Sequence, residues 1–258
     1  MNSRYMRAFT VLTFVLLCFY FGNAESQEFV TNGLIGFWTL DKGTVNGDIL
    51  KDAWGKNDGT IKGSPKVVNG KIKDGLDFNG KDQYVLLPDM GHEPAVTVEA
   101  WTLAHSLPPV AHSCCIGIVS SAPEDQWVAG TVHFKFEAGA ITADKNGSGK
   151  IRFDSAAAEE WYHAVYTVDT AANEFKLYIN GKLAAEMGSG AEPNNLTHVR
   201  IASEHEGRYL PGIVDEVRIY KRALSADEVG RNFAVKTNTI AVVSANKLSI
   251  EWGMVKSQ

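Results

Sequence analysis

The stretch GIVDEVRIYKRALSADEV, residues 212–229, carries the pattern of a strand followed directly by a helix. Apolar and polar residues alternate from Gly212 to Tyr220 with the two-residue period of a β-strand. Ser225, with Glu228 three residues later, forms the capping-box pattern that begins a helix. We expect this helix to end near Val235, so the stretch predicts a long strand and one short C-terminal helix.

An acidic residue stands out in this strand. If the strand is regular, Ile213, Asp215, Val217 and Ile219 point to one side, because side chains alternate between the two faces of a sheet. An ionised carboxylate on an apolar face needs hydrogen-bond donors or a cation to offset its lost hydration. The sequence therefore predicts that Asp215 either binds a metal or is paired inside the protein.

The rest of the chain contains many short strands joined by tight turns. Six Asn-Gly dipeptides punctuate the sequence, and Asn-Gly favours the positive φ angles of hairpin turns. In the segment 174–187, a two-residue loop at Asn180-Gly181 would place Tyr178 opposite Leu183. Further strands are expected at residues 34–40, 82–88, 95–104, 114–121, 132–142, 150–154, 161–169 and 198–204. This spacing predicts an all-β protein, a two-sheet antiparallel sandwich.

The N-terminal residues 1–24 resemble a secretory signal peptide. Arg4 and Arg7 precede the apolar run 8–21, and small residues follow at 22–24. We therefore expect a secreted or extracytoplasmic protein, in the periplasm or at the cell surface, with no membrane insertion after cleavage. Without the leader the chain has 23 basic and 30 acidic residues, a net charge of −7, which argues against a nucleic-acid partner.

Residues 28–235 contain no long linker or low-complexity block, and we expect them to form a single domain. Residues 236–258 read as a C-terminal extension with two strand-like runs, either an added hairpin or a poorly docked tail. Cys114 and Cys115 are adjacent, so they form either a strained vicinal bridge or two buried free thiols. They lack the spacing of zinc ligands.

The order of these pieces resembles the concanavalin A-like lectin/glucanase superfamily, in its laminin G-like and pentraxin-like branch of jelly-roll domains. The resemblance implies two curved antiparallel sheets, found mainly in secreted and surface proteins that bind carbohydrates or other ligands, often with calcium. The segment 103–131 matches the family only loosely, which leaves the particular ligand open. The matching pieces are LIGFWTLDKG (34–43), NDGTIKG (57–63), GLDFNGKDQYVLLP (75–88), VTVEAWT (96–102), EWYHAVYTVD (160–169), KLYINGKL (176–183) and DEVRIYKRALSADEV (215–229).

The acidic residues argue against catalysis. A glucanase on this scaffold needs two carboxylates on one strand face, usually as Glu-x-Asp-x-x-Glu, and the sequence contains no such triplet. The neighbouring acids at 159–160 and 215–216 would point to opposite faces of a strand. We therefore expect no catalytic residues and a protein that is not an enzyme.

Calcium is the expected cation if Asp215 binds a metal. Asp41 is the second expected ligand, because the first and last strands of jelly rolls are often neighbours and calcium prefers oxygen ligands. The alternative is that Asp215 accepts hydrogen bonds from backbone amides or pairs with Arg218 or Arg200. The pentraxin-like resemblance offers a different cation position, at Asp125, Glu204 and Glu206.

Sugar binding usually needs an exposed aromatic face together with polar groups that fix the hydroxyls. Trp127, His205 and Tyr209 lie in expected loops and are the candidate ligand-binding residues, although either aromatic ring could instead pack over a sheet edge. Trp38, Trp101 and Trp161 lie in expected strands and are expected in the core. His163 is expected there as well, as a buried histidine that forms hydrogen bonds.

These features together predict a secreted noncatalytic binding module whose partner is an extracellular glycan. Two alternatives stay open. A protein-protein or adhesion module would bind a surface protein through a flat apolar patch on the same scaffold. A diverged glycoside hydrolase would need a carboxyl pair roughly 5 to 9.5 Å apart in a cleft.

Overall fold

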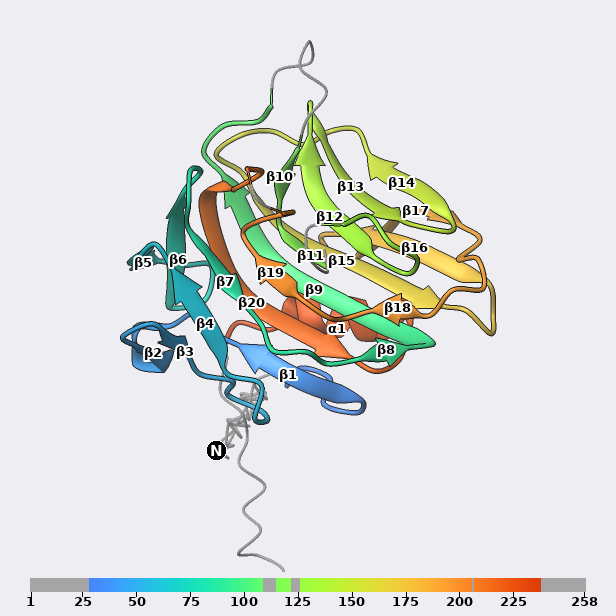
Figure 1. Ribbon diagram of the computed structural model, residues 1–258, viewed down its shortest axis with the longest axis horizontal. Coiled ribbons are helices and arrows are strands. Elements are labelled where there is room, and N and C mark those ends of the chain that lie inside the picture. Colours follow the sequence, from blue (N-terminus) through green and yellow to red (C-terminus); the bar gives the residue numbers. More distant parts are fainter. Residues whose placement is uncertain (1–27, 109–114, 122–125, 206, 238–258) are drawn as a thin grey trace, which may run out of the picture.

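The computed structural model describes residues 28–108, 115–121, 126–205 and 207–237. Antiparallel strands fill most of this part of the chain and stack in two layers, with one short helix on the outside (Figure 1). No helix among the described residues is both long and apolar enough to span a bilayer. The expected all-β jelly-roll sandwich with one C-terminal helix is confirmed.

The first layer is an eight-stranded sheet with the order β17-β16-β15-β9-β20-β6-β5, in which β1 also pairs with β20. The first and last long strands of the domain are therefore neighbours, as the resemblance implied. The strands of this layer are β1 (Leu34–Trp38), β5 (Lys66–Asn69), β6 (Asp74–Asn79), β9 (Ala95–Ala104), β15 (Trp161–Asp169), β16 (Glu174–Ile179), β17 (Lys182–Met187) and β20 (Pro211–Tyr220).

The second layer combines a six-stranded sheet, β11-β19-β7-β4-β3-β2, and a four-stranded sheet, β10-β12-β13-β14. Ile118 connects them, because its amide donates to Phe134 and its carbonyl accepts from Ala202. The strands are β2 (Val45–Asn46), β3 (Ile49–Leu50), β4 (Gly59–Lys62), β7 (Tyr84–Leu86), β10 (Ile116–Gly117), β11 (Val119–Ser121), β12 (Val132–Glu137), β13 (Ala140–Lys145), β14 (Gly149–Phe153) and β19 (Val199–Ile201). Outside the two layers lie the pair β8 (His92–Glu93) and β18 (Asn194–Asn195), and the 3-10 turn η1 (Lys42–Thr44).

The main hydrophobic core lies between the layers. Phe134 of β12 meets Tyr166 of β15 edge to face with ring centroids 5.3 Å apart, a favoured aromatic geometry. A second cluster lies on the outer face of the eight-stranded sheet, beneath the helix α1 (Ala226–Ala234). Of the expected core tryptophans, Trp38 and Trp101 are buried, whereas Trp161 is half-buried.

The expected helix start and hairpin are confirmed. The Ser225 hydroxyl accepts from the Glu228 amide and the Glu228 carboxylate accepts from the Ser225 amide, which completes the capping box. Tyr178 lies opposite Leu183 in the hairpin of β16 and β17. One expected strand is wrong in its length: residues 132–142 are not one strand, because Gly139, with φ +68°, turns the chain between β12 and β13.

The expected face of Asp215 is also wrong. Strand β20 contains a bulge between Asp215 and Arg218, where Glu216 takes a φ of +53°. The extra residue shifts the alternation, so that Val214 and Val217 both face the main core. Asp215 therefore points to the outer face of the sheet, away from Val217.

Candidate functional site

Polar side chains cover the outer face of β12 in the second layer. His133, Lys135 and Glu137 alternate along this strand with the core residues Phe134 and Phe136. Although they face outward, His133 and Lys135 are buried, at 8% and 5% exposure. Neighbouring side chains must therefore cover and pair with them.

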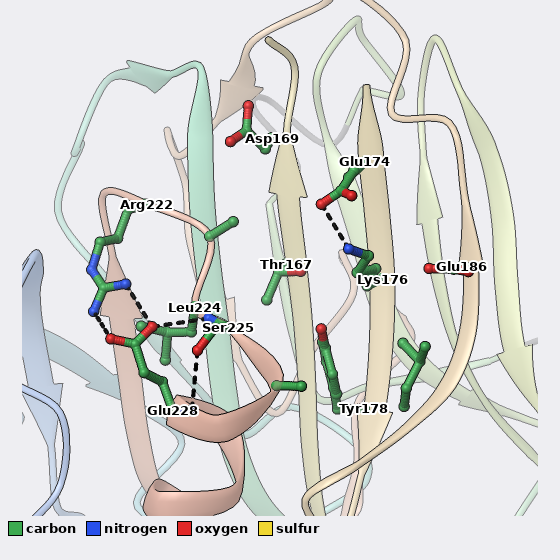
Figure 2. Close-up of a pocket in the computed structure, with 13 residues that line it drawn as sticks. Thr167, Asp169, Glu174, Lys176, Tyr178, Glu186, Arg222, Leu224, Ser225 and Glu228 are labelled. Carbon is green, nitrogen blue, oxygen red and sulfur yellow. Dashed lines mark hydrogen bonds and ion pairs between the residues drawn. The ribbon is translucent and has the colours of Figure 1, made fainter. Parts of the chain in front are cut away.

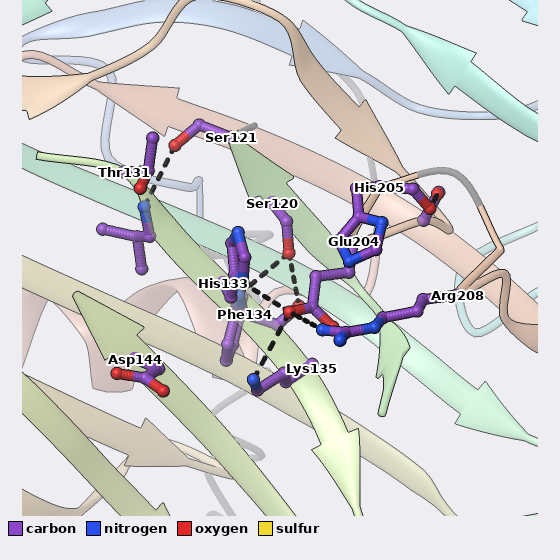
Figure 3. Close-up of polar contacts among 12 residues, drawn as sticks. Ser120, Ser121, Thr131, His133, Phe134, Lys135, Asp144, Glu204, His205 and Arg208 are labelled. Atoms are coloured by element: carbon purple, nitrogen blue, oxygen red, sulfur yellow. Dashed lines mark hydrogen bonds and ion pairs between the residues drawn. The ribbon is translucent and has the colours of Figure 1, made fainter. Parts of the chain in front are cut away.

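Glu204 is the centre of this surface, and its side chain is fully buried. Its Oε1 accepts from Arg208 Nη1 at 2.8 Å and lies 3.4 Å from Lys135 Nζ. His133 Nδ1 makes a third, very close contact with the same oxygen (Figure 3). We name these four residues the Glu204 cluster, because the other three side chains converge on one carboxylate.

The Glu204 cluster holds its carboxylate ionised. Burial alone would raise the pKa of Glu204, but the hydrogen bond from His133 and the charge of Lys135 together lower it far below its ordinary value. For Lys135, burial favours the neutral amine, yet the charge of Glu204, together with smaller contributions from Cys115, Glu137 and Asp144, raises the pKa of the ammonium group. The charges therefore persist at neutral pH because they compensate one another.

Two buried polar atoms in the Glu204 cluster have no hydrogen-bond partner among the described residues. They are His133 Nε2 and Glu204 Oε2, the atoms on the far side of the contact that joins the two side chains. A buried polar group without a partner costs about 1 to 3 kcal/mol. The cluster therefore keeps unused hydrogen-bonding capacity at its centre.

An exposed tryptophan lies beside the ring of His133. The ring of Trp127 is 4.3 Å from that of His133, and 44% of the residue is exposed. The Asn146 side chain donates to the Trp127 carbonyl at 2.8 Å, which fixes the backbone at this point. The half-buried ring of His205 approaches His133 from another side, at 6.2 Å. The structure thus brings the predicted residues Trp127 and His205 together around His133.

The third predicted binding residue lies in a different environment. The ring of Tyr209 stacks on Tyr84 of β7 at 6.0 Å, and the Arg200 guanidinium lies 5.8 Å from the Tyr84 ring. The half-buried Tyr209 therefore packs over the sheet, as the alternative interpretation expected. Its neighbour Arg208 belongs to the Glu204 cluster, so the loop still contributes to the site.

The sequence prediction missed His133 and Lys135. The polar residues of VHFKFE (132–137) alternate with apolar ones, a pattern that would have placed both side chains on the outer face of one strand. Glu204 had been considered as a cation ligand, but the structure surrounds it with basic side chains. The other two residues of that cation position, Asp125 and Glu206, lie outside the described residues.

Asp215 is covered by the turn between β5 and β6. Its Oδ2 accepts from the Ile72 amide at 2.8 Å, whereas its Oδ1 has no partner among the described residues, and the backbone amides of Ile72 and Lys71 both favour the ionised carboxylate. Burial first, and the charge of Glu216 second, raise the pKa of Asp215 to about 8. The carboxyl group is therefore largely protonated at neutral pH.

Asp41 lies within electrostatic range of Asp215, because its charge adds to the same rise in pKa. Asp41 Oδ1 accepts from the Asp74 amide at 3.2 Å, and Lys73 Nζ lies 3.8 Å from Oδ2. Among the described residues, no group of three or more His, Cys, Asp or Glu side chains is arranged to hold a metal. Asp215 Oδ1 is an oxygen of the kind that calcium binds, but the described residues do not supply the other ligands of a full oxygen shell. The calcium site therefore stays a prediction.

Two further carboxylates, Asp77 and Glu159, flank His105 just after the end of β9. Its Nε2 is 2.9 Å from Asp77 Oδ1 and its Nδ1 is 3.1 Å from Glu159 Oε1. Burial lowers the pKa of His105, but the hydrogen bonds to Asp77 and Glu159 outweigh it and raise the pKa overall. The imidazole occupies the space between the carboxylates, where the sugar of a glycosidase would have to lie.

Cys115 and His163 are both buried. Cys115 is a buried free cysteine and forms a hydrogen bond with Glu204, while Cys114 lies outside the described residues. His163 is buried as expected, but both of its ring nitrogens lack hydrogen-bond partners among the described residues. The prediction of a hydrogen-bonded histidine was therefore wrong.

Solved structures with a similar fold include sugar-binding proteins. Domain 4 of AbnA, a GH43 extracellular arabinanase from Geobacillus stearothermophilus solved with arabinotriose, has 18% identity and a TM-score of 0.61, and the match covers 78% of this chain and 98% of that one. Trypanosoma rangeli sialidase has 18% identity and a TM-score of 0.63, with 80% of this chain and 33% of that one covered. The binding domain of Paraclostridial Mosquitocidal Protein 1 has 16% identity and a TM-score of 0.62, with 78% and 52% covered.

A search of curated proteins finds no match to the sequence. The match to the sialidase spans only a third of that protein, and identities this low show a shared fold alone. The family model described as the concanavalin A-like lectin/glucanases superfamily, Laminin_G_3, matches residues 79–230. Because this match covers more than half of the sequence, the chain belongs to the concanavalin A-like lectin/glucanases superfamily.

Proposed function

We propose that the protein is a secreted, noncatalytic carbohydrate-binding module and that the Glu204 cluster, with Trp127 and His205, forms its binding site. The observation that carries this proposal is the exposed residue Trp127 against the ring of His133, whose Nε2 has no hydrogen-bond partner among the described residues. A pyranose or furanose ring needs an apolar face to stack on and nearby polar groups for its hydroxyls. This surface offers both.

The polar atoms suit hydroxyl groups in particular. A hydroxyl both donates and accepts a hydrogen bond, and Glu204 Oε2 is an acceptor. Arg208, whose side chain is 32% exposed, adds a charged donor at the rim. A sugar hydroxyl placed beside Glu204 would gain a charge-assisted hydrogen bond from a group that is already dehydrated, which favours affinity.

The charges also support a noncatalytic role. Lys135 Nζ lies 3.4 Å from both Glu204 Oε1 and Glu137 Oε1. Burial raises the pKa of Glu137, but the hydrogen bond from Lys150 and the charge of Lys135 lower it overall. A glycosidase needs one carboxyl group that keeps its proton at the working pH, and both of these carboxyl groups lose theirs.

The comparisons support a carbohydrate as the ligand class. One similar structure contains arabinotriose, and a sialidase of which about a third shares this fold was solved with sialic acid. These ligands belong to those proteins, so neither fixes the sugar that this chain binds. The leader-like residues 1–24 support an extracellular glycan as the partner.

The adhesion alternative needs a broad apolar patch. The large apolar side chains that are exposed in the described part of the chain come singly from five segments: Ile49, Trp54, Val67, Trp127 and Leu183. Scattered exposed apolar residues are ordinary on a protein surface. They support a small-ligand site more than a flat protein interface.

A glycan array tests the proposal, with the exported protein compared against Trp127→Ala and Trp54→Ala. The two tryptophans are exposed to a similar extent, 44% and 40%, so Trp54→Ala is the matched control. We expect Trp127→Ala to weaken binding to the strongest glycan at least tenfold, while Trp54→Ala binds as wild type does. Retained binding in Trp127→Ala, or no bound glycan for the wild type, would overturn the proposal.

A further inference from the structure

A groove of about 540 Å³ lies on the opposite layer of the sandwich, away from the Glu204 cluster. Its floor is the outer face of β15, β16 and β17, and its wall is the segment 222–228 at the start of α1 (Figure 2). We call it the back groove. The helix covers the sheet only as far as this groove, so these three strands keep an accessible outer face.

Two hydroxyl groups on the floor have no partner. Thr167 and Tyr178 line the back groove, although the two residues are only 2% and 3% exposed. No hydrogen bond joins either hydroxyl to another described residue, and Figure 2 shows both side chains on the floor of the groove. Side chains so deeply buried have fixed positions, so their hydroxyls are preorganised to meet a ligand in the groove.

Ion pairs surround these hydroxyls. Arg222 holds Glu228 with two hydrogen bonds, from Nη1 at 2.8 Å and from Nη2 at 2.7 Å. Lys176 donates to Glu174 at 2.7 Å and lies opposite Glu186 on the adjacent strand. Each basic side chain is thus already paired, whereas the acceptor oxygens of the carboxylates keep further lone pairs.

The charge balance of the back groove selects among ligand classes. Four carboxylates (Asp169, Glu174, Glu186 and Glu228) line it against two basic side chains, Lys176 and Arg222. The excess of two negative charges repels an anionic ligand. A neutral molecule with several hydroxyls fits better, because each hydroxyl can donate to a carboxylate and accept from Thr167, Tyr178 or a basic group.

The rim of the groove adds an apolar contact. Leu183 is 50% exposed and lies opposite Tyr178 across the β16–β17 hairpin. The carbon-bound hydrogens of a sugar ring form an apolar face that can pack on such a side chain. We propose that the back groove is a second binding site, for a unit of a neutral glycan, and that it is separate from the Glu204 cluster.

This inference does not depend on the proposed function of the Glu204 cluster. Amide and methyl chemical shifts of the isotope-labelled protein test it, measured during titration with neutral trisaccharides of arabinose, xylose, glucose, galactose and mannose. Sialyllactose, a carboxylated sugar, serves as the anionic comparison. We expect at least one neutral trisaccharide to shift the signals of Thr167, Lys176 and Leu183, and sialyllactose to leave them unchanged.

Variants assign the effect to the hydroxyls. Thr167→Val and Tyr178→Phe remove one hydroxyl each with almost no change of shape, and each should weaken neutral-sugar binding at the groove about three- to tenfold. Trp127→Ala should leave groove binding intact, which separates the two sites. No shift at the groove with any neutral trisaccharide, or equal binding by both hydroxyl variants and the wild type, would overturn the inference.

Discussion

His133 Nδ1 and Glu204 Oε1 are in direct contact, and the ring of Trp127 packs against the His133 ring. This contact joins the second-layer strand β12 to the loop after β19, two segments far apart in the sequence. It leaves Nε2 and Oε2 of the same two side chains without partners among the described residues. The pair therefore joins the two segments, and in the proposed binding mode its free atoms are those that a sugar hydroxyl meets.

Glu204→Gln should destabilise the protein by about 3 kcal/mol, because it removes the charge that compensates Lys135 and Arg208 in a buried site. Guanidinium unfolding at pH 7 measures this loss. Glu137→Gln is the control: Glu137 is partly exposed, so its loss should cost about 1 kcal/mol or less. Equal losses in both variants would contradict a central role for Glu204.

Glu204 should also make the stability of the protein depend on pH in the acid range. Because the pKa of Glu204 is lowered in the folded state, its ionised form stabilises the protein above pH 4.5, and this contribution is lost as the pH falls below that value. The difference in unfolding free energy between wild type and Glu204→Gln should therefore shrink from pH 7 to pH 3. A constant difference over that range would show that Glu204 is not the acid-sensitive group.

Asp215 should instead make the protein less stable as the pH rises. Its pKa is raised to about 8, so the stability given by the neutral carboxyl group is lost as the pH rises through 8. Asp215→Asn keeps an acceptor for the amides of Lys71 and Ile72 and cannot ionise. Measured with chelator present, we expect this variant to be more stable than wild type at pH 9. A wild type that loses no stability between pH 6 and pH 9 would contradict the raised pKa.

A calcium ion bound by Asp215 and Asp41 would require Asp215 to lose its proton, so its stabilising effect should grow as the pH rises. We expect excess calcium to raise the thermal midpoint more at pH 9 than at pH 6, with no rise in Asp215→Asn or Asp41→Asn. Asp144→Asn, which alters a carboxylate of the other layer, is the control. An unchanged midpoint at both pH values would exclude this calcium site and leave Asp215 as a hydrogen-bonded acid.

His163 offers a test of the core. Its ring packs against Trp101 at 5.1 Å and Phe233 at 5.8 Å, and burial lowers the pKa of His163 to about 4. Its neutral form therefore stabilises the fold above pH 6.5, and this contribution is lost as the pH falls through 4. His163→Phe should raise stability by about 1 kcal/mol at pH 7, because two unpartnered nitrogens disappear, and by more at pH 5. A variant less stable than wild type at pH 5 would refute this account.

The regular parts of the fold were predictable from local patterns. The long strands β9 and β15 match their predicted bounds, because continuous apolar and aromatic residues leave no break to misplace. The Ser225 cap and the Asn180-Gly181 turn follow from chemistry within a few residues. The bulge at Glu216 was not predictable, because nothing in DEVRIY marks an extra residue, and it moved Asp215 to the other face.

The candidate site was predictable only in part. Trp127 and His205 were singled out because aromatic and basic residues in loops are common at ligand sites, and the structure places both beside His133. The position of His133 beside Glu204 could not be predicted, because this contact joins segments more than 70 residues apart, and a single sequence does not reveal such a pairing. The packing of Tyr209 could not be chosen over its exposure, because its stacking partner, Tyr84, lies on a strand far away in the sequence.

The most direct test of the central claim is a crystal structure of the exported protein with its strongest array glycan. The account predicts a sugar ring stacked on the Trp127 indole, with a hydroxyl within hydrogen-bonding distance of His133 Nε2 or Glu204 Oε2. A glycan bound elsewhere, with both of these atoms still unpaired and Trp127 uncovered, would contradict the claim.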